Sequence, residues 1–234
     1  MIGVPHVHHR ATDSTNERAK DLAQSGAPHG TLVTAGEQGA GRGRQGRQWS
    51  APPGAAVLMS LVLRELDESA DLLPLAAAVA VCEAVEAQTP VECLVKWPND
   101  VWAQGRKLAG ILIEGRPQEG WAVLGIGLNV STSAFPADLA RIATSLALSA
   151  PSGPPPPVTA VLAGLLDRLE RRLPAPADET LAAWRERDAL HGHAVRWADG
   201  QGTAAGIDET GALLVRTGSG THALQAGEVH LQRR

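Results

Sequence analysis

The 234-residue sequence predicts an α/β (α+β) fold, in which a mixed sheet with helices is followed by a small β-barrel. Three observations lead to this class. Strand-like and helix-like segments alternate from the N-terminus to about residue 190. Only short strand-like segments, separated by glycine turns, follow Gly192. The composition, 44% apolar and 20% charged, is that of a globular protein and excludes long disorder. We therefore expect two domains, residues 1–187 and 188–234.

The expected strands are runs of aliphatic and β-branched residues that end at glycine, proline or asparagine. In the first domain they span residues 4–10, 31–37, 55–63, 91–97, 101–102, 107–114 and 121–130. A turn at residues 104–106 joins two of them as a hairpin. In the tail, turns at residues 199–200, 209–211 and 218–220 leave segments of the size needed for a five-stranded barrel.

Helices are expected where capping residues precede apolar residues that recur every three or four positions. They follow residues 13–16 (DSTN) to about residue 25, span residues 74–88 with Pro74 in the first turn, begin at residue 158 and span residues 178–190. The segment 150–157 (APSGPPPP) is a proline-rich connector.

The charge balance and the cysteines narrow the classes of function. A formal net charge of −4 argues against a general nucleic-acid binder. Cys82 and Cys93 are too few for a disulfide framework and form no CxxC metal motif, so we expect reduced core thiols in a cytoplasmic protein. The first ten residues lack the apolar stretch of a signal peptide, and the apolar run 72–85 is too short to span a bilayer. No membrane partner is expected.

The most informative segment is a loop rich in glycine and arginine, residues 41–47 (GRGRQGR). Its arginines supply planar donors suited to carboxylates and phosphates, and its glycines let backbone N–H groups turn toward a bound anion. The loop also matches GxGxxG, but the following residues QWSAPPG cannot open the helix that a dinucleotide fingerprint requires. Anion capture, a solvated flexible loop and an RNA contact all remain open on composition alone.

Three further clusters carry polar groups at the expected strand ends. They are residues 96–100 (KWPND), 107–114 (KLAGILIE) and 125–129 (GIGLN). Each has an ordinary structural explanation when taken singly: Asp100 as a turn residue, Lys107 as a hairpin charge and the glycines as packing positions.

Taken together and in this order, these segments resemble the biotin protein ligases, also called biotin–[acetyl-CoA carboxylase] ligases. The resemblance covers DSTN at 13–16, Gln38 with the GRGRQGR loop and Trp49, KWPND, KLAGIL, GIGLN and GALL at 211–214. It implies a mixed-sheet biotin/lipoate ligase catalytic domain and a C-terminal SH3-like β-barrel.

The resemblance also implies the reaction and the partners. Biotin is adenylated by ATP with Mg²⁺ to biotinyl-5′-AMP, and the biotinyl group then passes to one lysine of a biotin carboxyl carrier protein or domain. Because carboxylate and phosphate repel each other, cations are required between them. Closure of the arginine loop is expected to exclude water from the mixed anhydride.

The resemblance assigns roles to individual residues. Catalytic roles fall to Lys107, Arg44 and Asp100. Biotin is expected to contact Ser14, Thr15, Asn16, Gln38, Gly41, Arg42, Arg44, Lys107, Gly110 and Gly125. ATP is expected to contact Arg44, Arg47, Trp49, Asn99, Asp100, Lys107 and Asn129, and Asp100 is the candidate ligand for Mg²⁺.

The sequence also departs from the family pattern. Gln45 and Gln48 stand where family members often carry basic residues, which predicts weaker retention of the adenylate. The DSTN motif begins at residue 13, so we expect no N-terminal winged-helix domain, no DNA binding and no repressor function. The alternatives are a lipoate or octanoate ligase or transferase of the same fold, and a non-catalytic binder. A homodimer is left open.

Overall fold

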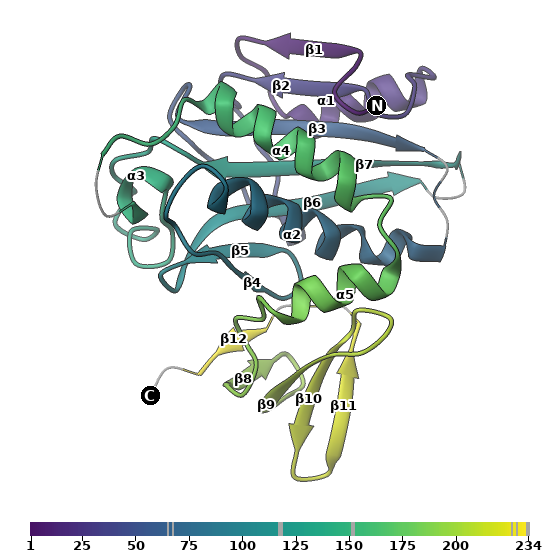
Figure 1. The fold of residues 1–234 in the computed structure, drawn as a ribbon, viewed down its shortest axis with the longest axis vertical. Helices are drawn as coiled ribbons and strands as arrows, with labels where there is room; N and C mark the ends of the chain where they lie inside the picture. Colours follow the sequence, from purple (N-terminus) through teal and green to yellow (C-terminus); the bar gives the residue numbers. More distant parts are fainter. Residues whose placement is uncertain are drawn as a thin grey trace.

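The computed structural model describes residues 1–64, 66, 68–116, 119–150, 153–225, 227 and 229–232. Within these residues, seven strands form one sheet in the order β1-β2-β3-β7-β6-β5-β4 (Figure 1). They are β1 (His6–His9), β2 (Leu32–Ala35), β3 (Ala56–Arg64), β4 (Leu94–Lys96), β5 (Asp100–Ala103), β6 (Arg106–Arg116) and β7 (Trp121–Asn129). β1 and β2 are parallel, and the other neighbours are antiparallel.

Helices cover both faces of this sheet. Helices α2 (Leu73–Glu86) and α4 (Val158–Arg172) lie on one face, and α1 (Thr15–Gln24) lies on the other (Figure 1). The alternation of side chains along each strand explains the two layers. Leu61 and Leu124 belong to the main core with α2 and α4, whereas their neighbours Val62 and Val123 pack in a second cluster with α1.

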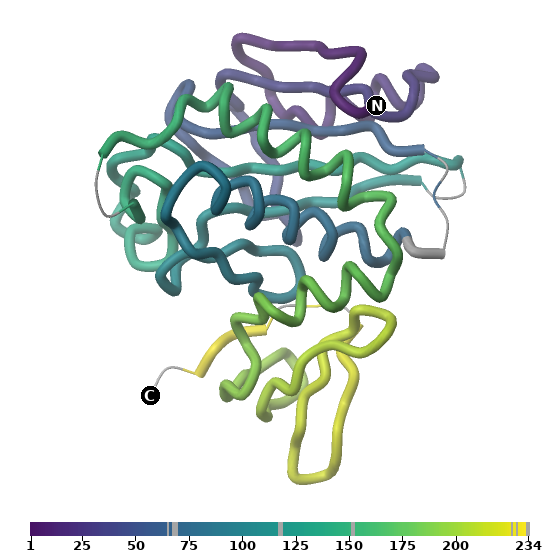
Figure 2. The backbone as a smooth tube through the Cα atoms, in the orientation of Figure 1, coloured from purple at the N-terminus to yellow at the C-terminus, as the bar shows by residue number. Residues whose placement is uncertain are grey.

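The second domain is a five-stranded antiparallel sheet in the order β11-β10-β9-β8-β12. Its strands are β8 (Ala194–Trp197), β9 (Gly200–Ile207), β10 (Leu213–Thr217), β11 (Gly220–Leu224) and β12 (His230–Leu231). It lies beyond α5 (Ala177–Arg185), at the β4 side of the large sheet and away from the N-terminus (Figure 2). One direct link between the domains is a hydrogen bond of 3.0 Å from Trp97 Nε1 to Gly211 O.

The mixed sheet followed by a small β-domain is therefore confirmed, with two corrections at the junction. The strand expected over residues 91–97 is reduced to β4, and the helix expected over residues 178–190 ends at Arg185. After α5 the chain pairs with β4 instead of continuing the helix: Arg187 O accepts from Val95 N (2.7 Å) and Val95 O accepts from Ala189 N (3.0 Å). The boundary predicted at residue 187 falls in this stretch and stays a prediction.

Three smaller differences concern caps and connectors. Ser14 is the N-cap of α1, but its side chain makes no capping hydrogen bond, because Gln38 takes that place. A short helix, α3 (Leu146–Ser149), was not predicted from the sequence. Of the expected connector at 150–157, residues 151 and 152 lie outside the described part of the chain.

Two further findings concern the helices and the thiols of the described chain. None of the described helices has the length and apolar character that crossing a bilayer would require. Cys82 and Cys93 are both free and buried in the main core.

Candidate functional site

A cavity of about 240 Å³ lies on the α1 face of the large sheet. The alternation along β7 explains its position. Trp121 and Val123 are covered by α1, and the next residues on the same face, Gly125, Gly127 and Asn129, line the cavity instead. The apolar part of this face is thus buried by the helix, and the part that carries glycine and polar residues faces an open space.

The glycines of the sheet let side chains from other elements approach its backbone. A Cβ atom at Gly125 would overlap Asn16 Oδ1, and one at Gly127 would overlap the indole ring of Trp49. A Cβ atom at Gly110 would lie 3.2 Å from the same ring and 3.1 Å from Lys107 Nζ. These positions require glycine because of close approach, not because of backbone conformation.

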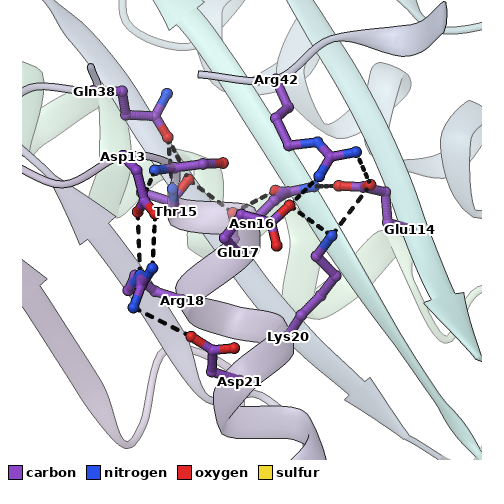
Figure 3. Close-up of polar contacts among 12 residues, drawn as sticks. Asp13, Thr15, Asn16, Glu17, Arg18, Lys20, Asp21, Gln38, Arg42 and Glu114 are labelled. Atoms are coloured by element: carbon purple, nitrogen blue, oxygen red, sulfur yellow. Dashed lines mark hydrogen bonds and ion pairs between the residues drawn. The ribbon is translucent and has the colours of Figure 1, made fainter. Parts of the chain in front are cut away.

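The polar floor of the cavity is built where α1 begins. Gln38 Oε1 accepts hydrogen bonds from Thr15 N (2.7 Å) and Thr15 Oγ1 (3.0 Å), so a side chain from the loop caps the helix (Figure 3). The buried Ser60 Oγ lies 2.8 Å from Thr15 Oγ1 and 2.6 Å from Asn16 Oδ1. The floor therefore presents several fixed hydrogen-bonding groups, which suit a small polar ring.

The loop of residues 38–53 is folded back on itself beside this floor. Gly43 N donates to Arg47 O (2.7 Å), Trp49 N donates to Gly41 O (2.9 Å), and Arg44–Gly46 form one 3₁₀ turn. Gly41 is buried against Trp49 O and does not line the cavity, so the structure does not bring this predicted biotin contact to the site.

Cationic side chains meet at the β5–β6 side of the cavity. Lys107 Nζ lies 2.6 Å from Asp100 Oδ1 and 5.8 Å from the centre of the Trp49 ring. Arg44 Nη1 donates to Asn99 Oδ1 (3.1 Å), and Asn99 is itself fixed by a bond of 2.6 Å from its Nδ2 to Ile111 O. The loop and the KWPND segment are therefore in direct contact.

The electrostatic balance of the cavity is positive. Its described lining residues include five Lys or Arg side chains and a single carboxylate, Asp100; the five cations are Arg42, Arg44, Arg47, Lys96 and Lys107. Burial lowers the pKa of Lys96 and of Arg44, while the negative charge of Asp100 opposes this shift. Burial has already removed part of the hydration of these two cations. Pairing with an anion that enters the cavity therefore stabilises their charged forms strongly.

Two buried polar atoms in the cavity wall have no hydrogen-bond partner within the described chain. They are Trp49 Nε1, a donor, and Asn129 Oδ1, an acceptor. Buried groups of this kind are normally paired, so they indicate where a ligand completes the site. Asn129 is held in place because its Nδ2 donates to Thr144 O (3.0 Å).

Comparisons with known proteins identify the family of the chain. The chain matches the model of the Biotin/lipoate A/B protein ligase family over residues 9–131 and that of the Biotin protein ligase C terminal domain over residues 198–231. It is 38% identical to the biotin--[acetyl-CoA-carboxylase] ligase of Mycobacterium tuberculosis, over 94% of this chain and 87% of the relative. The chain belongs to the biotin protein ligase family. It is accordingly a ligase enzyme.

This ligase is also similar to a bifunctional protein and to a biotin protein ligase of known structure. The bifunctional ligase/repressor BirA of Bacillus subtilis is 34% identical, over 99% of this chain and 75% of its own length. The biotin protein ligase of Aquifex aeolicus, solved in complex with biotin and ATP, superposes with a TM-score of 0.84 at 29% identity. That match covers 98% of this chain and 99% of the other.

Apart from Gly41, every residue predicted from the sequence to bind or react lines the cavity of the ligase. The individual roles remain predictions. Several lining or supporting residues were not predicted: Ser60, Lys96, Gly127, Phe135 and His230. Lys96 and Gly127 lie inside the motifs KWPND and GIGLN, so the motifs themselves carried the signal. Nothing in the sequence near Ser60, Phe135 or His230 points to the site.

The predicted metal ligand has little support from its surroundings. Within the described residues, no group of three or more His, Cys, Asp or Glu side chains could hold a metal ion. Asp100 is instead paired with Lys107. A resident metal therefore does not fit the side chains around Asp100, whereas a cation carried in by a polyphosphate needs only one protein carboxylate.

Proposed function

We propose that this ligase adenylates biotin with ATP and then transfers the biotinyl group to a lysine of a biotin carboxyl carrier domain. The observation that carries the proposal is the cavity itself, in which a polar floor from α1 adjoins a cluster of cations around one carboxylate. Biotin, a cyclic urea with a carboxylate tail, requires the polar floor, and a nucleoside triphosphate requires the cations. The reaction between them requires that the two halves lie side by side. Mg²⁺ would enter as the counter-ion of the ATP phosphates, and Asp100 is the carboxylate of the described lining that would be available to it.

In the first step, a carboxylate oxygen of biotin attacks the α-phosphorus of ATP. The new bond joins that oxygen to phosphorus, and the bond to the β-phosphate oxygen breaks to release pyrophosphate. Both reactants are anions, so Lys107 and Arg44 are the residues that we expect to lower their repulsion. We assign the ureido ring to Thr15, Asn16 and Gln38, which line the cavity together with Ser14.

In the second step, the amine of the carrier lysine attacks the carbonyl carbon of the mixed anhydride. A carbon–nitrogen bond forms, the carbon–oxygen bond to the phosphate breaks, and AMP leaves. The attacking amine must be neutral, and the proton that it loses as the amide forms passes to water. Asp100 is the one carboxylate among the described lining residues, so we assign it the orientation of this amine, and we assign Trp49, Asn99 and Asn129, which line the same cavity, to the nucleotide.

The partners follow from the relatives and the charges. Two relatives are named biotin--[acetyl-CoA-carboxylase] ligases, which favours a carrier of the acetyl-CoA carboxylase type. We propose that DNA is not a partner and that there is no repressor function, because the net charge is −4 and the cations described above gather in the cavity. The free, buried thiols of Cys82 and Cys93 favour a cytoplasmic location.

The proposed function is tested by the complete reaction. The purified ligase is incubated with biotin, ATP, Mg²⁺ and a biotin carboxyl carrier domain, and the carrier mass is measured. We expect the mass of one biotinyl group on one lysine, and no product when that lysine is replaced by arginine. Modification by lipoate in place of biotin would instead support the lipoate ligase alternative.

Replacing Arg44 with alanine tests the role of the loop. Arg44 lies against Asn99 in the cavity wall, so its loss removes one charge-assisted contact to the adenylate. We expect bound biotinyl-5′-AMP to dissociate about tenfold faster, measured by filter retention of labelled intermediate. Arg216→Ala, an exposed arginine of β10, is the matched control. An unchanged dissociation rate for Arg44→Ala would remove this loop contact from the mechanism.

A further inference from the structure

A cluster of four charged side chains joins the arginine loop to the sheet and to α1. Arg42 of the loop forms ion pairs with Glu17 of α1 and with Glu114 of β6, the latter at 3.2 Å (Figure 3). Lys20 of α1 contacts the same two carboxylates, Glu17 at 2.8 Å and Glu114 at 3.4 Å. Two cations and two carboxylates therefore balance each other at the rim of the cavity.

Glu114 connects this cluster to the polar floor. Its Oε1 atom faces the two cations, and its Oε2 atom accepts a hydrogen bond of 2.9 Å from Asn16 Nδ2. The other side of the Asn16 amide, Oδ1, lies 2.6 Å from Ser60 Oγ. Through one carboxylate, the orientation of an amide in the floor is thus linked to the position of an arginine in the loop.

The geometry of this cluster differs from that of an ordinary surface ion pair. Arg18, on the same helix, pairs with Asp13 and Asp21 within one stretch of chain. Glu114 instead joins three elements that are far apart in sequence, and its side chain is only 20% exposed. A single-atom change at Glu114 should therefore affect both the floor and the loop, since removing one partner leaves polar groups of the other two unpaired.

We propose that Glu114 is a positioning residue of the ligase: it orients Asn16 for the acid substrate and anchors Arg42 so that the loop lies over the cavity. Glu17 serves as the second anchor of Arg42 and does not touch the floor. The part of this inference that concerns substrate rests on the proposed function. The part that concerns the loop does not.

The loop anchor is tested without any substrate. The ligand-free protein is treated with trypsin, and cleavage after Arg47 is followed by mass spectrometry in the wild type, Glu114→Gln, Glu17→Gln and Asp21→Asn. We expect cleavage to be about fivefold faster in both glutamine variants, since each loses one of the two partly exposed ion pairs that hold Arg42. Asp21→Asn, which removes an ion pair confined to α1, should cleave at the wild-type rate. Wild-type cleavage rates in both glutamine variants would overturn the anchor.

The link to the substrate is tested by steady-state kinetics of biotin-dependent pyrophosphate release. Glu114→Leu removes the acceptor of the Asn16 bond, which glutamine would keep. It should raise KM for biotin about tenfold more than Glu17→Gln, which affects Arg42 and Lys20 but no described contact of the floor. Arg42→Gln removes the loop residue that Glu17 contacts. In that background, Glu17→Gln should not increase the rate of trypsin cleavage further, because Glu17 acts on the loop only through Arg42. Equal KM values in Glu114→Leu and Glu17→Gln would contradict the role of Glu114 in the floor.

The two sets of results separate the inference from the proposed function. If the wild type released no pyrophosphate with biotin, the proposed function would fail, while the trypsin rates would still decide whether Glu114 and Glu17 anchor the loop. If biotin activity were normal and all four proteins were cleaved equally, the positioning role would fail alone.

Discussion

Replacing Lys107 with alanine is expected to slow biotin-dependent pyrophosphate release about a thousandfold. Lys107 Nζ lies 2.6 Å from Asp100 and beside the Trp49 ring, at the centre of the cation cluster. Its removal deletes the cation that we place between the biotin carboxylate and the α-phosphate. It also leaves the Asp100 carboxylate without this partner, so that its charge adds to the repulsion between the reactants.

The measurement is the single-turnover rate of adenylate formation at saturating biotin and ATP. Arg106→Ala is the matched control, because Arg106 directly precedes Lys107, belongs to the same strand and is not among the residues that line the cavity. We expect this control to react at close to the wild-type rate. A Lys107→Ala rate within a few-fold of the wild type would contradict the assignment of Lys107.

Replacing Gly125 with alanine should raise KM for biotin by about 10- to 100-fold. A Cβ atom at this position overlaps Asn16 Oδ1, so the Asn16 side chain must turn away. It then loses its contacts with Ser60 and Glu114, and the floor of the cavity loses a fixed amide. The overlap is with the end of a side chain on the cavity face, so we expect the fold to survive.

The comparison is Gly218→Ala, because a Cβ atom at Gly218 meets no atom within 4 Å. The two variants are compared by thermal unfolding and by KM for biotin. We expect both to unfold near the wild-type temperature and only Gly125→Ala to show the higher KM. An unchanged KM for Gly125→Ala would mean that Asn16 does not contact the substrate.

Much of the fold could be predicted because local patterns agreed with the final packing. The alternation of the strands and the helical spacing after residue 158 both describe faces that the structure buries. The predictions were wrong where a tertiary contact overrides local preference. Residues 187–189 pair with Val95 rather than extend α5. No pattern in the local sequence predicts this contact.

The candidate site could be predicted in outline for a different reason. Its motifs place Lys107, Asp100 and Asn99 at strand ends or turns near one another in sequence, so the hairpin alone brings them together. The pairing of Arg42 with Glu17 and Glu114 joins a loop, a helix and a strand, and only the assembled sheet reveals it. The stacking of Trp49 on Gly127 could not be predicted for the same reason.

The most direct test of the central claim is the choice of acid in the first half-reaction. Pyrophosphate release from ATP and Mg²⁺ is measured with biotin, lipoate or octanoate as the sole carboxylic acid, without any carrier. We predict release that depends on biotin and is lost in Lys107→Ala. Release with lipoate or octanoate but not with biotin, or no release with any of the three acids, would contradict the account.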